Sequence, residues 1–143
     1  MFSKTCEYAI RASIFIATQS YENNRVTIKE IAENIDSPLS FTAKILQILA
    51  KKGIVQSIKG IGGGFEIPKE AIAKITLDQI VTAIDGDSIF TGCGLGLNHC
   101  SKERPCPLNK RFRNIREDLA KMLQTTTLEE LALDINAGDS YLI

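Results

Sequence analysis

Apolar residues recur at helical spacing over most of the chain, and capping signals divide the pattern into separate elements. Residues 6–20 carry an apolar or small stripe and follow Ser3, a residue suited to cap a helix. Residues 28–35 repeat the pattern after Thr27, and Glu30 completes a capping box with that threonine. The pattern therefore predicts a long first helix and a short second helix.

A third helix and a β-hairpin are predicted next. The turn residues Ser37 and Pro38 precede a periodic stretch, 41–52, which ends at Gly53. Residues 54–67 place apolar positions on both sides of the glycine-rich tip GIGGG, a pattern typical of a hairpin. The result is a helix-turn-helix with an adjoining hairpin, or wing.

The C-terminal half is predicted to contain three further helices and one loop. Thr76 caps a helix over 77–84, the segment 85–107 has no helical or strand period, and a short helix covers 128–135. Between the segment 85–107 and the last helix, the helical stretch 109–124 carries a heptad-like apolar seam that is longer than one small domain needs. We therefore expect this helix to pack against a second copy of the chain. The members of the seam are Leu108, Phe112, Ile115, Leu119 and Met122.

The fold class that follows is mainly α with a small β-hairpin wing. We expect a winged helix-turn-helix DNA-binding domain in residues 1–84, a cysteine-rich cluster-binding loop in 85–107, and a long dimerisation helix with a short helix in 108–143. With 143 residues, 44% of them hydrophobic, the chain is long enough for one core and too short for two ordinary domains. Neither a membrane-spanning run nor a signal peptide is recognised, so we expect a cytoplasmic protein without a membrane contact.

Charge and motif together favour DNA as the partner. The formal net charge is zero, but between Phe41 and Gly64 the chain carries four lysines and no acid. The second helix of a helix-turn-helix enters the major groove, and a wing lies along phosphates or the minor groove. The expected contacts to double-stranded DNA are Ser37, Ser40, Thr42 and Lys44 on the helix and Lys59, Gly62 and Gly63 on the wing. The alternative is an ordinary helical pair and hairpin that bind another protein.

An enzymatic function is not expected. The tip GIGGG lacks the third glycine of a dinucleotide-binding loop, where Phe65 stands, and lacks the Gly-Lys-Ser/Thr of a phosphate loop. No constellation of serine, histidine and acid is visible, and the only histidine, His99, lies in the cysteine-rich segment.

Three of the four cysteines, Cys93, Cys100 and Cys106, lie in the segment CGLGLNHCSKERPC. Iron–sulfur clusters are held by thiolates from short irregular loops, because several ligands must converge on one inorganic core. The spacing is wider than the two-residue gaps of a zinc ribbon, so a 2Fe-2S or 4Fe-4S cluster is the first interpretation and zinc the second. Three free thiols without a metal are the third.

Three thiolates leave a fourth ligand position open. From the residues alone, the candidates are His99, Cys6, Glu7 and Asn109. Cys6 is expected in the core, because it falls near the apolar stripe of the first helix and cysteine is among the most buried residue types.

The assembled motifs resemble the Rrf-type family of winged-helix transcription regulators, which includes IscR-like and NsrR-like proteins. The resemblance covers nearly the whole chain and rests on CEYAIRA, SPLSFTAKILQILAKKGIVQSIKGIGGGFEI, LDQIVTAIDG and the three loop cysteines. It implies a homodimer whose long C-terminal helices cross, two wings on DNA, and an iron–sulfur cluster on Cys93, Cys100 and Cys106 near the dimer interface.

Two positions distinguish the branches of that family. The cluster-biogenesis regulators have a ligand histidine where this chain has Asn109, whereas Glu7 matches a position at which several sensors use an acidic ligand from the partner subunit. The resemblance therefore implies a transcriptional regulator, a repressor in the first instance, whose DNA affinity responds to nitric oxide or to redox or iron status. The alternative is a zinc-stabilised or cluster-free winged-helix regulator or protein-interaction module.

Overall fold

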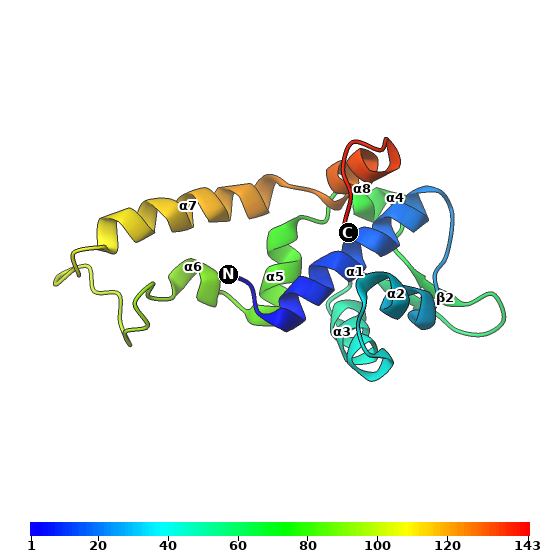
Figure 1. The fold of residues 1–143 in the computed structure, drawn as a ribbon, viewed down its shortest axis with the longest axis horizontal. Helices are drawn as coiled ribbons and strands as arrows, with labels where there is room; N and C mark the ends of the chain where they lie inside the picture. Colours follow the sequence, from blue (N-terminus) through cyan, green and yellow to red (C-terminus); the bar gives the residue numbers. More distant parts are fainter.

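The first helix, α1 (Lys4–Tyr21), forms the centre of the fold in this computed structural model, which describes residues 1–143 (Figure 1). Ser3 caps it as predicted, since the Ser3 hydroxyl accepts a hydrogen bond from the Cys6 amide. Small and β-branched residues of α1 are buried on several sides, and five other helices pack against it.

The helix-turn-helix and the wing have the predicted order. The Thr27–Glu30 capping box fixes the start of the second helix, α2 (Ile28–Ile35), with both of its hydrogen bonds present. Asp36, in a left-handed conformation, ends α2 and turns the chain toward Pro38. The wing is an antiparallel hairpin with Ser57 opposite Phe65. The elements are α2 (Ile28–Ile35), α3 (Leu39–Lys51), β1 (Gln56–Ile58) and β2 (Gly64–Glu66).

The C-terminal half contains two helices that the hydrophobic pattern does not predict. Each is a single turn of four residues, too short to show a helical period. One of them, α6, lies inside the segment predicted to have no regular structure, so that prediction is wrong for Ser88–Thr91. The elements are α4 (Lys69–Ile72), α5 (Leu77–Asp85), α6 (Ser88–Thr91), α7 (Asn109–Thr125) and α8 (Leu128–Asn136).

One hydrophobic core joins the two ends of the sequence. Leu123, Leu128 and Ala132 are buried in the same cluster as the inner residues of α1, α2 and α3. Backbone hydrogen bonds from Leu77 to Thr126 and from Leu128 to Ile75 tie the connection between α7 and α8 to the start of α5. The C-terminal residues therefore complete the core around the N-terminal helices, while the division into three functional segments stays a prediction.

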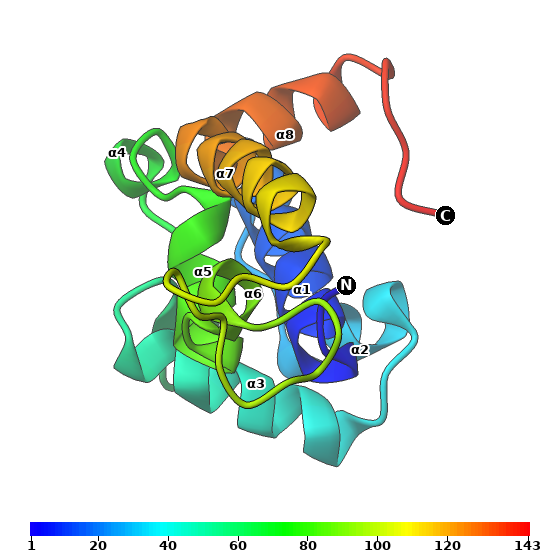
Figure 2. The same ribbon diagram turned by 90° about the vertical axis from the view of Figure 1, so that its left-hand side faces the viewer.

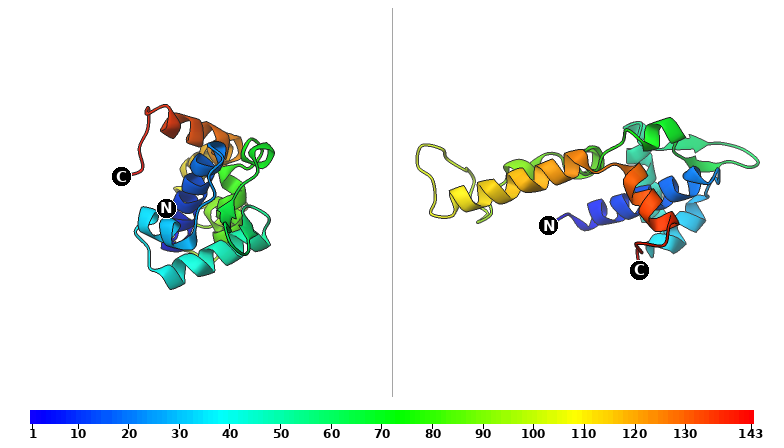
Figure 3. Two further views of the ribbon diagram at one scale, coloured as in Figure 1. Left: turned by 90° about the vertical axis from the view of Figure 1, so that its right-hand side faces the viewer. Right: turned by 90° about the horizontal axis from the view of Figure 1, so that it is seen from above.

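The molecule is elongated. The wing lies at one end of its long axis, and the loop before α7 lies at the other (Figures 1 and 3). Helix α7 leads from the core toward that far end, packed on α5 and α6. None of the helices combines the length and the apolar character that crossing a membrane requires.

Candidate nucleic-acid interface and cysteine loop

The outward face of α3 is polar and basic. Ser40, Lys44 and Gln47 are all exposed and follow one another at helical spacing. The N-terminus of α3 has no side-chain cap, and the backbone amides of Leu39 and Ser40 have no hydrogen-bond acceptor within the chain. Unpaired amides at a helix N-terminus attract phosphate oxygens, so this end of α3 suits a nucleic-acid contact.

Two of the residues predicted to contact DNA, one in α3 and one in the turn before it, are less exposed than such a contact requires. Thr42 is fully buried, and its hydroxyl donates to the Pro38 carbonyl at 3.0 Å, so the prediction of an exposed Thr42 side chain is wrong. The reason is helical phase, because Thr42 lies between the exposed positions 40 and 44 and points toward the core. Ser37 is half-buried, with its hydroxyl 3.5 Å from the same carbonyl.

The wing presents its tip to solvent. Lys59 and Gly62 are exposed, and Ile61 between them is fully exposed. Gly63 is half-buried, and a Cβ atom there would lie 2.3 Å from the Ile58 carbonyl oxygen, so no side chain fits. Ile61 is a candidate that the sequence analysis missed, since an apolar residue in a hairpin pattern is ordinarily assigned to the core. Exposed apolar tips are used as wedges in DNA minor grooves.

The three loop cysteines share one small cavity at the far end of the molecule, in the loop that faces the viewer in Figure 2. The cavity has a volume of about 50 Å³, and Cys93, Cys100 and Cys106 are each half-buried in its wall. His99 and Asn109, two of the fourth-ligand candidates, line it as well. The structure therefore brings together the three residues that the sequence singled out.

Hydrogen-bond donors surround two of the sulfur atoms. The Leu95 amide lies 3.4 Å from Cys93 Sγ, and hydrogen bonds from the backbone of the 95–97 turn lower the pKa of the Cys93 thiol. Asn109 Nδ2 donates to Cys100 Sγ at 3.0 Å, and Arg116 approaches the same sulfur at 3.7 Å. Asn109 is therefore a donor to a thiol, which is a different role from that of a ligand.

The residue types of this loop suit a metal group, but the positions of their side chains do not yet form a metal site. No three side chains among the His, Cys, Asp and Glu residues lie close enough to hold one metal ion. The thiols nevertheless share a cavity, and N–H donors directed at sulfur are the usual surroundings of cluster thiolates. The residues fit an iron–sulfur cluster in kind, and the loop has to rearrange to turn the three sulfur atoms toward one another.

The fourth cysteine, Cys6, lies in the core as predicted. It is fully buried in α1, and burial, with the nearby Asp85 carboxylate, raises the pKa of its thiol to about 12. The adjacent Glu7 is half-buried, pairs with Lys4 at 3.3 Å, and does not line the cysteine cavity of its own chain.

Helix α7 exposes an apolar stripe that nothing in the chain covers. Leu108, Ile115 and Met122 are exposed at seven-residue spacing, and Ile115 is 61% accessible. The other two members of the predicted seam, Phe112 and Leu119, are half-buried. Leu119 packs against the chain's own core, so the predicted seam is divided between an internal face and an open face.

Comparison with known proteins is decisive for the family. The model of the family Rrf2, described as an iron-dependent transcriptional regulator, matches residues 2–134. The chain belongs to the Rrf2 family. It is 31% identical over 124 residues to the HTH-type transcriptional regulator IscR of Yersinia pseudotuberculosis, an alignment that covers 87% of this chain and 74% of IscR. The predicted family is therefore confirmed, and its relatives are transcriptional regulators, as expected for a protein that is not an enzyme.

Two solved structures of regulators have the same fold. IscR of T. potens superposes with a TM-score of 0.76 at 18% identity, over 100% of this chain and 93% of the other. CymR of B. subtilis, the global cysteine regulator, superposes with a TM-score of 0.74 at 22% identity, over 92% of this chain and 95% of the other. The mainly helical fold with a two-stranded wing is thus confirmed for this Rrf2 chain. The names of these regulators differ, so fold alone does not assign a signal.

Proposed function

We propose that this Rrf2 regulator binds operator DNA as a homodimer and that an iron–sulfur cluster on its loop controls the affinity. The observation that carries the proposal is the shared cavity of Cys93, Cys100 and Cys106, with N–H donors directed at two of the three sulfur atoms. Bound there, a 2Fe-2S or 4Fe-4S cluster supplies a redox-active core that is sensitive to nitric oxide and oxidants.

The chain's own residues have separate roles in this proposal. Hydrogen bonds from the 95–97 turn favour the thiolate form of Cys93, the form that binds metal. Asn109 and Arg116 donate to Cys100 and stabilise negative charge on its sulfur. On the DNA side, Ser40, Lys44 and Lys59 are exposed for contacts to base edges and phosphates, and Gly62 offers a backbone amide at the wing tip.

The partner subunit completes the site. The exposed stripe of Leu108, Ile115 and Met122 is the surface on which a second α7 packs. Glu7 lies on α1, outside the cysteine cavity of its own chain, and supplies a carboxylate to the loop of the partner. A change at the loop then alters the contact between protomers, and with it the separation of two α3 helices that must lie about 34 Å apart to bind two half-sites.

Metal analysis of protein purified without oxygen tests the cluster. We expect iron and acid-labile sulfide together with visible absorbance, and loss of all three in Cys93→Ser, Cys100→Ser and Cys106→Ser variants. Cys6→Ala is the matched control, because Cys6 is buried in the core and should leave the iron content unchanged. Stoichiometric zinc without iron would instead support the zinc-stabilised alternative, and metal-free protein would support a cluster-free regulator.

DNA affinity tests the regulatory half. A duplex selected from a random pool by the untreated protein serves as operator, and affinity is measured before and after anaerobic exposure to nitric oxide. We expect a change of about 5- to 150-fold, the usual range for coupled sites. Equal affinities before and after exposure would reject nitric oxide as the signal and leave a DNA-binding protein. Glu7→Gln should weaken cluster retention without changing the affinity of the metal-free protein for DNA.

A further inference from the structure

The wing of this regulator is a weak element by itself. Its strands have three residues each, and an isolated two-stranded hairpin is at best marginally stable in water. Within the tip the only internal bond outside the strands runs from the Gly63 amide to the Gly60 carbonyl. A tip of this kind needs an external support to hold one orientation against DNA.

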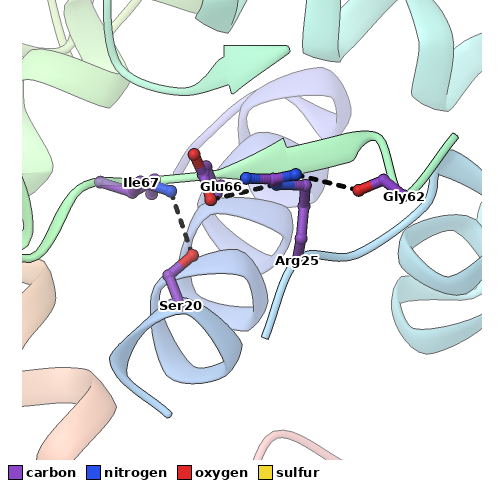
Figure 4. Close-up of polar contacts among 5 residues, drawn as sticks. All are labelled: Ser20, Arg25, Gly62, Glu66 and Ile67. Carbon is purple, nitrogen blue, oxygen red and sulfur yellow. Dashed lines mark hydrogen bonds and ion pairs between the residues drawn. The ribbon is translucent and has the colours of Figure 1, made fainter. Parts of the chain in front are cut away.

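The link between α1 and α2 provides that support (Figure 4). Arg25 Nη1 donates to the Gly62 carbonyl at 2.9 Å, and Arg25 Nε donates to Glu66 Oε2 at 3.1 Å. One guanidinium thus connects the tip of the wing, its returning strand and the segment that enters the helix-turn-helix. The bond that Gly62 accepts from Arg25 is the only hydrogen bond between residues 59–63 and a residue outside the hairpin.

The neighbouring backbone makes the same connection rigid. Val26 and Phe65 exchange hydrogen bonds of 3.1 and 2.6 Å, so the segment before α2 joins the outer edge of β2 through a single β-bridge. The Ser20 hydroxyl, at the end of α1, accepts a hydrogen bond from the Ile67 amide at 3.0 Å (Figure 4). The base of the wing is therefore fixed, and Arg25 extends this fixation to the tip.

The charges in this cluster argue for a positioning role. Arg25–Glu66 is one of only two ion pairs in the chain, and its side chains are 37% and 31% exposed. A surface ion pair of this exposure contributes little to stability. An acidic residue beside a DNA-binding wing also repels phosphate, so Glu66 has an evident use only if it orients Arg25.

We propose that Arg25 and Glu66 are positioning residues for DNA binding, which hold the wing tip in its DNA-competent orientation. The proposal rests on the proposed function in that DNA is the ligand, and it is independent of the cluster. The guanidinium holds the Gly62 carbonyl, and through that peptide it fixes where Lys59, Ile61 and the free Gly62 amide meet the duplex. Because the tip is ordered before binding, less conformational entropy is lost on DNA.

The sign of the Glu66→Ala effect separates positioning from simple electrostatics. Removal of a negative charge near DNA strengthens binding if charge alone matters. If Glu66 positions Arg25, Glu66→Ala and Arg25→Ala each weaken binding, by about tenfold, because the tip must then be ordered on every binding event. The double variant should bind no more than about twofold weaker than either single variant, since both changes break one unit.

Two controls and one local measurement complete the test. Glu70→Ala removes an exposed acid on α4, four residues from Glu66, and should bind operator as wild type does or slightly more tightly. Glu66→Gln keeps an acceptor oxygen for Arg25 and should retain most of the affinity. In hydroxyl-radical footprints of the selected operator, Arg25→Ala should lose protection only at the outer positions covered by the wings, while protection under α3 persists.

Each outcome decides one question. Tighter binding by Glu66→Ala, or additive losses in the double variant, would overturn the positioning role. A uniform loss of footprint would assign Arg25 a general structural role instead. If Arg25→Ala fails to fold, as far-ultraviolet circular dichroism would show, the Glu66→Ala, Glu66→Gln and Glu70→Ala series decides alone. Absence of binding by the wild-type protein would refute the proposed function, which is a distinguishable result.

Discussion

The base of the wing can be probed by adding a single methyl group. Gly64 has a φ of +142°, and a Cβ atom there would lie 2.5 Å from the Val26 carbonyl oxygen, which is backbone and cannot rotate away. Gly64→Ala therefore has to strain the strand or separate it from Val26. Gly53→Ala is a matched control, because Gly53 also has a positive φ, +74°, but its added Cβ would have no neighbour within 4 Å.

The expected magnitudes follow from these two environments. Gly53→Ala should lower the free energy of unfolding by about 1 kcal/mol, the cost of a left-handed L-residue. Gly64→Ala has a backbone cost of about 1–3 kcal/mol. It also loses the two hydrogen bonds between Val26 and Phe65, each worth about 1 kcal/mol. We therefore expect Gly64→Ala to be more destabilising than the control by about 2–4 kcal/mol, and to bind operator more weakly.

Urea unfolding followed by far-ultraviolet circular dichroism measures the difference. With a slope of about 2 kcal/mol per molar urea, the midpoint of Gly64→Ala should fall about 1–2 M below that of Gly53→Ala, with similar slopes for both variants. Equal midpoints would contradict the packing of the wing base against Val26. A Gly64→Ala variant with normal stability and normal DNA affinity would also remove the basis for a fixed wing.

Four further predictions follow from individual side chains. In metal-free protein at neutral pH, iodoacetamide should modify Cys93 at least about a thousandfold faster than Cys6, measured by mass spectrometry, because the Cys6 pKa is raised to about 12. Cys6 also binds its proton more tightly in the folded than in the unfolded protein, so its stabilising contribution is complete below pH 9.0 and is lost as the pH rises toward about 12. The free energy of unfolding should therefore fall over this range, and Cys6→Ala should reduce that fall in unfolding curves recorded at increasing pH. Ile115→Glu should convert the proposed homodimer to a monomer in sedimentation equilibrium, because it places a charge in the exposed stripe of α7. Ile61→Ser should weaken operator binding severalfold without changing the melting temperature, because Ile61 is fully exposed.

The parts of the fold that could be predicted are those with strong local chemistry. Ser3 and Thr27 use side-chain oxygens to cap helices, and both caps occur where the sequence placed them. Thr127 likewise accepts a hydrogen bond from the Glu130 amide at the start of α8. Short helices such as α6 depend on tertiary contacts with α7 and carry no periodic signal of their own.

The site was predicted less evenly than the fold. Cysteine spacing identified the three thiols that share a cavity, because the loop that carries them is short and joins two helices, α6 and α7, that pack against each other. The exposure of Thr42 was not predicted correctly, since positions two residues apart on a helix differ by about 200° in direction and Thr42 therefore lies on the face opposite to Ser40 and Lys44. Arg25 was missed because its partners lie 37 and 41 residues away in the chain, and no local pattern encodes such a contact.

The distance between the cysteine loop and the wing constrains how one can influence the other. The two lie at opposite ends of the protomer (Figure 1), so a change at the loop cannot reach DNA by direct contact. Helix α1, about 27 Å long at 1.5 Å per residue, is bonded at both ends. Near its start, the Ser3 amide donates to Asp85, the last residue of α5 before the loop segment, and near its end Ser20 accepts from the wing residue Ile67. A close-packed core moves as a body. Under the proposed function, a displaced loop would therefore move the wing and α3 of its protomer together, and the change would lie in the relation between the two protomers on DNA.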